Sequence, residues 1–255
     1  MPGEYFCFKS GRKTNPLGLE WEYHMIEEML EDVNMEELAK LILIKEKETL
    51  KEFPPYDHSQ SSDGYTQLGK ESLTSRSYAY NLLKWNHPEI NKLKLAILKA
   101  HNQLIKLIKI DRPARIYCHA WANVMRKGEQ IKPHLHDATP DSYVSGHITV
   151  QCEASETHYI CPVDQINSPS EYKSKNVPGK ITLFQSCIPH YTSKHEGDKE
   201  RISIAFDLIT DNNSQFFTNN VAPLKHWLFL TEGDFLKGTG YSSQDKQKVI
   251  FHENS

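Results

Sequence analysis

The sequence predicts an α+β fold in which a helical N-terminal region precedes an antiparallel β core. Two long stretches before residue 112 repeat their apolar residues at helical spacing, whereas six short β-type segments with turns between them occupy residues 114–209. Strands that follow one another without intervening helices favour a sandwich or a barrel over alternating β-α units. We therefore expect a helical region at 1–111, a β core at 112–210 and a C-terminal extension at 211–255.

Two helices are predicted in the first region. Residues 25–50 place apolar side chains mostly at three- and four-residue steps, with acidic residues early and lysines late, an order that suits the helix dipole. A second helix is expected to start near Asn86 as N-cap, with Pro88 in its first turn, and to run to about Lys109. Its apolar stripe requires a sheet to cover.

Between these helices, residues 56–78 form a long polar segment that is rich in Ser and Gly and lacks either periodicity. A segment of this length is typical of a lid over a functional site or of a disordered loop. Thr74, Ser75 and Arg76 are candidates to touch an acidic group of a substrate, but a solvated loop is the simpler interpretation.

The predicted strands lie at residues 114–125, 132–136, 142–152, 157–163, 179–186 and 201–209. The last one has the clearest pattern, because Arg201, Ser203 and Asp207 alternate with isoleucine, phenylalanine and leucine. Alternate side chains of a strand leave on the same face. The apolar face is expected to build the core, and the polar face to open onto something else.

Charge and cysteine content exclude several classes of protein. A net charge of −3, from 30 basic and 33 acidic side chains mixed along the chain, gives no signal for nucleic acid or anionic lipid. Five cysteines without paired spacing predict reduced thiols in a cytosol. Because no apolar run reaches the length of a membrane span, we expect a soluble cytoplasmic protein.

His134 and His136 form the strongest candidate for a metal site. In an extended strand the two imidazoles leave on the same face and can share one ion. The other histidines (His119, His147, His158 and His195) are more simply interpreted as satisfied surface or core residues, although His147 and His158 are candidates to flank a pocket.

The motif that contains this pair resembles a known family. Residues 128–136, GEQIKPHLH, look like the glycine-to-His-x-Asp segment of iron(II)/2-oxoglutarate oxygenases, particularly of the prolyl 4-hydroxylase branch. Residues 177–184, VPGKITLF, resemble the Pro-Gly turn and following strand of that branch. His190 comes next, and Arg201 and Ser203 follow eleven and thirteen residues later.

The resemblance covers about 90 of the 255 residues, and Trp121, Asn123 and the stretch SGHITV are similar to uncharacterised phage and bacterial members. It implies a double-stranded β-helix, or jelly-roll, for the core at 112–210, with iron(II) and 2-oxoglutarate as cofactors. A phage-encoded member is expected in the host cytoplasm.

Particular residues match the ligands of that family. His134 matches the first metal ligand and His190 the distal one, while His136 stands where the family carries Asp. Iron(II) that also binds a 2-oxoacid and dioxygen leaves three positions to the protein, usually filled by two His and a carboxylate. Three neutral imidazoles also suit copper, nickel or zinc. Asp137 or Asp141 is the alternative acidic ligand.

Arg201 matches the residue that binds the distal carboxylate of 2-oxoglutarate. Its planar, permanently charged fork can bind that carboxylate with two hydrogen bonds, which Lys cannot do. Ser203, on the same face, adds a hydroxyl, and Asn123 is the third candidate for contact with the co-substrate.

The resemblance implies a hydroxylase-type oxygenase that oxidises an unidentified substrate, a protein side chain or a small molecule, and releases succinate and CO2. A cupin-like metalloenzyme is a second hypothesis, because the spacing from Gly128 through the histidine pair to Asp141 fits half of the cupin motif. The other half does not fit. A non-catalytic, metal-binding β-barrel module is the third hypothesis. The sequence leaves the substrate and the oligomeric state open.

Overall fold

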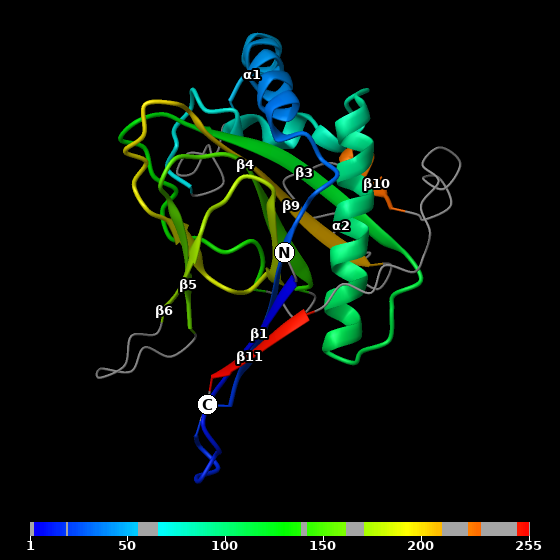
Figure 1. The fold of residues 1–255 in the computed structure, drawn as a ribbon, viewed down its shortest axis with the longest axis vertical. Coiled ribbons are helices and arrows are strands. Elements are labelled where there is room, and N and C mark those ends of the chain that lie inside the picture. Colours follow the sequence, from blue (N-terminus) through cyan, green and yellow to red (C-terminus); the bar gives the residue numbers. More distant parts are fainter. Residues whose placement is uncertain are drawn as a thin grey trace.

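The computed structural model describes residues 3–18, 20–55, 66–138, 142–161, 171–210, 224–230 and 249–254. Their strands form two sheets (Figure 1). The strands of the main sheet are β1 (Gly3–Lys9), β2 (Glu22–Met29), β3 (Ile116–Met125), β4 (Val144–Gln151), β7 (Lys180–Gln185), β9 (Arg201–Thr210), β10 (Leu228–Phe229) and β11 (Val249–Asn254), in the order β10-β3-β9-β4-β7-β2-β1-β11. The minor sheet has the order β6-β5-β8 and comprises β5 (Glu156–Ile160), β6 (Glu171–Lys175) and β8 (His190–Thr192).

Two α-helices accompany the sheets (Figure 1): α1 (Met35–Glu52) and α2 (Pro88–Leu107). Short 3-10 helices are η1 (Thr74–Ala79), η2 (Leu82–Lys84) and η4 (Leu224–His226). The side chain of Asn34 caps α1 by accepting the backbone N–H groups of the second and third residues that follow it. The second predicted helix is confirmed, although its N-cap is His87 and not Asn86.

The main sheet is buried on both faces. Apolar residues of α1 and α2 pack with Ile148, Ile204 and Phe206 of the sheet in one hydrophobic cluster. On the other face, Phe184 of the main sheet packs with Tyr159 of the minor sheet in a second cluster. The interior between the two sheets is therefore separate from the core beneath the helices. This arrangement confirms the predicted α+β jelly-roll class.

The prediction of one helix over residues 25–50 is wrong in its first part. Residues 22–29 form β2, and the helix begins only at Met35. Ile26 packs in the cluster beneath the helices and Met25 in the cluster between the sheets, so both faces of β2 are covered and these adjacent residues are both buried. A strand buried on both faces does not alternate polar and apolar residues. Its apolar spacing therefore resembled the start of the helix.

The N-terminal region also contributes a strand that the sequence did not predict. β1 pairs with β2, so part of residues 1–111 lies in the main sheet. In the C-terminal extension, β10 pairs with β3 and β11 pairs in parallel with β1. The division at 111/112 and 210/211 stays a prediction, but residues from all three regions build one sheet.

Of the predicted strands, the segment 132–136 is not a strand, and a single bridge joins His134 to His190. The other five correspond to β3, β4, β5, β7 and β9.

The predicted polar loop at 56–78 is described only from residue 66 onward. The solvated-loop interpretation is wrong for Thr74, Ser75 and Arg76, which are all buried. Arg76 donates hydrogen bonds to backbone carbonyls of Phe53, Lys70 and Ser72. Its guanidinium therefore holds the end of this segment against α1 and is not presented to a substrate.

Among the described residues, no helix is both long and apolar enough to cross a membrane.

One ion pair links α1 to the end of β3 and supports a prediction about stability. Arg126 donates two hydrogen bonds, of 2.8 and 2.7 Å, to the buried carboxylate of Glu46. Arg126→Ala leaves this carboxylate unpaired, so we expect the free energy of unfolding to fall by about 1–3 kcal/mol. Lys127→Ala removes the adjacent exposed pair with Asp198 and is expected to leave the free energy of unfolding unchanged. Urea unfolding followed by circular dichroism measures both, and equal midpoints would contradict the prediction.

Candidate metal centre and its surroundings

The interior between the two sheets carries the polar face of β9. Directly paired residues of antiparallel strands share a face, and Ser203 pairs with Asn123 on β3 and with Thr149 on β4. Asp207 likewise pairs with Ser145 of β4. The predicted alternation along β9 is confirmed, because the isoleucine, phenylalanine and leucine positions lie in the cluster beneath the helices.

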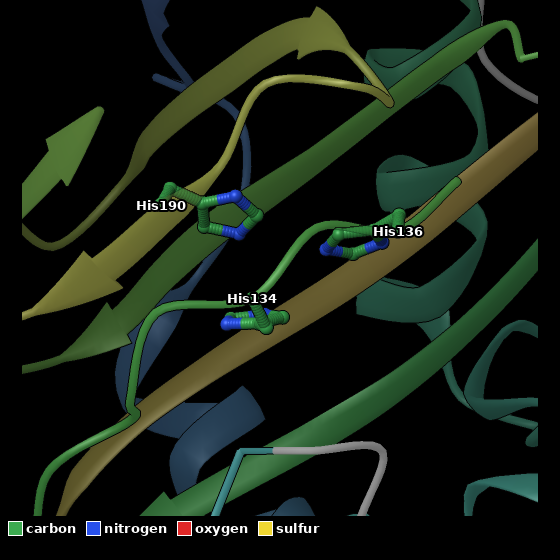
Figure 2. Close-up of side chains that lie close together, drawn as sticks. All are labelled: His134, His136 and His190. Atoms are coloured by element: carbon green, nitrogen blue, oxygen red, sulfur yellow. The ribbon is translucent and has the colours of Figure 1, made fainter. Parts of the chain in front are cut away.

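Three histidines gather at this interior (Figure 2). His134 and His136 come from the segment after β3, and His190 is the first residue of β8. The backbones of His134 and His190 exchange two hydrogen bonds, of 3.0 and 2.8 Å. One potential ligand atom from each of the three rings lies within 4.8 Å of those of the other two. The group that the sequence predicted is thus brought together.

Each of these rings is oriented by an acceptor at Nδ1. The Nδ1 atom lies 2.8 Å from the carbonyl oxygen of Lys132 in His134 and 3.0 Å from that of Ile188 in His190. In His136 it lies 2.5 Å from Oδ1 of Asp207. An acceptor at Nδ1 holds the ring proton on that nitrogen. The lone pair of Nε2 is then available to bind a metal, as in other metal-binding histidines.

Asp207 is the functional candidate that the sequence interpretation missed. Its Oδ1 also accepts a hydrogen bond of 2.7 Å from Ser145, whose hydroxyl lies 2.7 Å from that of Ser186. The signal was available, because Asp207 shares the polar face of β9 with Arg201 and Ser203. What the sequence could not show is that the segment after β3 brings His136 to this carboxylate.

Burial sets the protonation of the centre. Burial, with a smaller contribution from the neighbouring histidines, holds the pKa of His190 well below its ordinary value, so this imidazole is neutral and competent to bind a metal. Burial raises the pKa of Asp207, but the charge and hydrogen bond of His136 and the hydrogen bond of Ser145 outweigh it and leave the pKa below its ordinary value. Asp207 is therefore an ionised carboxylate.

Arg201 is buried without a carboxylate partner among the described residues. Its side chain is 1% exposed; Nε donates to the hydroxyl of Ser155 at 3.1 Å and Nη1 contacts the sulfur of Met125 at 3.4 Å. Burial lowers the pKa of Arg201 to about 10, so the guanidinium still carries its charge at neutral pH. A buried cation normally has an anionic partner. This one fits an anion supplied from outside the chain.

The surroundings of Arg201 contain further polar groups. Ser203 and Asn123 are buried beside it, and the side chain of Asn123 accepts a hydrogen bond of 2.6 Å from Thr74. Thr149 Oγ1 and His147 Nδ1 are buried and have no hydrogen-bond partner among the residues that the structure describes. Unpaired buried polar atoms are rare in native structures and are expected where a ligand or water binds. These atoms fit a polar co-substrate held by Arg201.

Of the other histidine and acid candidates, only His147 lies at the interior among the described residues. His158 faces away from the interior and stacks on Tyr191, whereas His147 faces the interior and its Nε2 lies 2.6 Å from the hydroxyl of Tyr159. Nε2 of His119 and Nε2 of His195 lie within hydrogen-bond distance of backbone carbonyl oxygens, whereas Nδ1 of His195 is buried without a partner among the described residues. The carboxylate of Asp137 does not belong to the cluster of potential ligand atoms formed by the three histidines. Asp141 lies outside the described residues.

Comparisons with known proteins agree with this geometry. Residues 119–207, from β3 to β9, match the family described as putative 2OG-Fe(II) oxygenase. No curated protein gives a significant match.

Three solved structures are similar to this chain at low sequence identity. The α-ketoglutarate-dependent carbocyclase SnoK from nogalamycin biosynthesis is 11% identical, with a TM-score of 0.50 over 81% of this chain and 92% of that chain. The epimerase SnoN from the same biosynthesis is 12% identical, with a TM-score of 0.47 over 82% of this chain and 91% of that chain. The viral collagen prolyl hydroxylase from Paramecium Bursaria Chlorella virus-1 is 13% identical, with a TM-score of 0.43 over 74% of this chain and 96% of that chain.

The family match covers the three histidines of the metal centre and Arg201 at the start of β9. Residues 119–207 thus match a family of iron(II)/2-oxoglutarate-dependent oxygenases, enzymes whose cofactors are Fe(II) and 2-oxoglutarate.

Proposed function

We propose that the protein is an oxygenase of the hydroxylase type, in which His134, His136 and His190 bind the iron and Arg201 binds the distal carboxylate of 2-oxoglutarate. The substrate is a protein side chain or a small molecule. Ser203 and Asn123 lie on the face of Arg201 and are proposed to contact the co-substrate.

The observation that carries this proposal is the unpaired, buried guanidinium on the face that also holds the metal centre. Arg201 and Asp207 lie on the same face of β9, and Asp207 is already engaged by His136. A dicarboxylate that binds the metal with one end and Arg201 with the other gives the buried guanidinium its missing anionic partner. A cupin-like metalloenzyme has no role for such an arginine, and a structural metal site has no use for a second, empty anion position.

The chemistry that iron(II) and 2-oxoglutarate supply when bound is oxygen transfer to the substrate with decarboxylation of 2-oxoglutarate to succinate and CO2. The residues of this chain bind and orient these groups. His134, His136 and His190 would hold the metal through three imidazoles, which is the number of protein ligands usual for such an iron. The apolar side chains of Phe184 and Tyr159 pack around His190 and exclude water from one side of the centre.

His136 in place of the usual carboxylate removes one negative charge from the ligand set. Asp207 places a negative charge behind the imidazole, because its carboxylate accepts a hydrogen bond from Nδ1 of His136. A carboxylate in this position increases the basicity of the imidazole and fixes its orientation. We propose that this pair takes the place of the usual Asp ligand.

Arg201→Leu tests the co-substrate site. Removing one partner of a buried charge pair costs about 2 kcal/mol or more, so we expect the Kd for 2-oxoglutarate to rise by at least about 30-fold. Iron content is expected to stay intact. Anaerobic calorimetric titration of the iron-loaded protein measures the affinity, and coupled succinate release measures turnover.

The matched control is Arg115→Leu, which changes an exposed arginine and is expected to bind 2-oxoglutarate like the wild type. Unchanged 2-oxoglutarate affinity in Arg201→Leu would disprove the assigned role of Arg201 and favour the cupin-like hypothesis.

Asp207→Asn tests the support of His136. Asn keeps the shape and an acceptor oxygen but removes the charge, so we expect iron(II) or cobalt(II) to bind about 10- to 100-fold more weakly. His136→Ala is expected to lose the bound metal, and Asp198→Asn, an exposed change, to have no effect. Equilibrium dialysis with elemental analysis measures all three. Full metal content in His136→Ala would show that His136 is not a ligand.

A further inference from the structure

A second group of metal-ligand residues lies on the opposite face of the main sheet, away from the barrel interior. Cys7 of β1 and His24 of β2 are directly paired, and Glu22 lies two residues from His24 on the same face. Phe6 and Met25, their sequence neighbours, pack in the cluster between the sheets, so Cys7 and His24 point the other way. One donor atom from each of the three residues lies within 4.8 Å of the others.

The separations between the donor atoms suit a tetrahedral ion. Sγ of Cys7 lies 3.2 Å from Oε1 of Glu22, and Nε2 of His24 lies 3.7 Å from the same oxygen. Zinc binds sulfur at about 2.3 Å and nitrogen or oxygen at about 2.0–2.2 Å, which at tetrahedral angles places neighbouring donors about 3.3–3.6 Å apart. Only small side-chain adjustments are therefore needed to enclose an ion.

A hydrogen bond at Nδ1 orients the imidazole ring of His24. The hydroxyl of Tyr5 lies 2.8 Å from Nδ1 of His24, which leaves Nε2 directed toward Glu22. A partner at the other ring nitrogen is the usual support of a metal-binding histidine. The side chain of Glu22 is 54% exposed and that of His24 is 18% exposed, so an ion can enter from solvent.

We propose that Cys7, Glu22 and His24 form a zinc site that is separate from the barrel centre. A thiolate, an imidazole and a carboxylate are all ligands of zinc, and the thiolate disfavours magnesium and calcium. Cys7 releases its proton to solvent on binding. Three protein ligands leave the fourth position to water. The ion would clamp β1 to β2, at the side of the sheet where β1 also pairs with β11.

Cobalt(II) is the probe that distinguishes this site from the barrel centre. It replaces zinc, and only a bound thiolate gives a sulfur-to-cobalt charge-transfer band in the near ultraviolet. We expect the metal-free full chain to develop this band as cobalt is added, with both metal sites filled by two equivalents, and Zn²⁺ to abolish it. Cys7→Ser and His24→Gln are expected to lose the band or to need at least tenfold more cobalt.

The controls separate the two sites. His190→Ala removes a barrel ligand and is expected to keep the band, as is Cys152→Ser, which changes a thiol on another part of the fold. Because Cys7 is buried, Glu22→Gln provides a second test at an exposed side chain and is expected to weaken cobalt binding at least tenfold.

No thiolate band in the wild type, or an unchanged band in Cys7→Ser, overturns the zinc site. Failure of the barrel histidines to bind iron leaves the expected thiolate band unaffected, so the two proposals fail independently.

Discussion

The structure depends on the pleat of β9, which separates an apolar face from a polar one in the middle of the main sheet. β3 and β4 pair with its two edges, and nearly all of its residues are buried, so both of its faces are covered. The apolar face holds the helices on the sheet. The polar face must then find its partners inside the barrel, where Arg201 and Asp207 are six residues apart and do not neutralise each other. Each is left to bind a different group.

The distribution of charge in the interior follows from this constraint. The buried Lys180 is neutralised within the chain, because its Nζ lies 3.2 Å from the carboxylate of Glu27 and also donates to Ser174. Asp207 is held by His136 and Ser145. Among the described residues of the interior, Arg201 is the cation that retains no carboxylate. A buried charge without a partner is costly, so its presence indicates a ligand more strongly than its position in a motif does.

Much of the site could be predicted from the sequence, because it depends on short-range spacing. The alternation along β9 identified the face of Arg201 and Ser203, and the spacing of the histidine pair identified two rings on one side. The segment around His134 nevertheless forms only one bridge, with His190, and the rest is held by contacts to β7-β8 turn carbonyls such as that of Ser186. Such contacts depend on tertiary structure and leave no local periodicity. The pairing of Asp207 with His136, across 71 positions of sequence, was hidden for the same reason.

The fold was predicted less completely where burial is two-sided. β2 is covered by helices on one face and by the interior on the other, so Met25 and Ile26 are both buried and the period of two disappears. The helical spacing of apolar residues in α1 was therefore assigned to β2 as well. The segment around Arg76 was predicted to be solvated because it is polar, but it is buried. Its burial is possible because backbone carbonyl oxygens accept the hydrogen bonds of the guanidinium.

The most direct test of the central claim is anomalous scattering at the iron edge from crystals grown without oxygen in the presence of Fe(II) and 2-oxoglutarate. An iron peak bonded to His134, His136 and His190, with the distal carboxylate of 2-oxoglutarate on Arg201, is the predicted result. An iron atom bound by Asp137 or Asp141 in place of His136, or 2-oxoglutarate that leaves Arg201 unpaired, would contradict it.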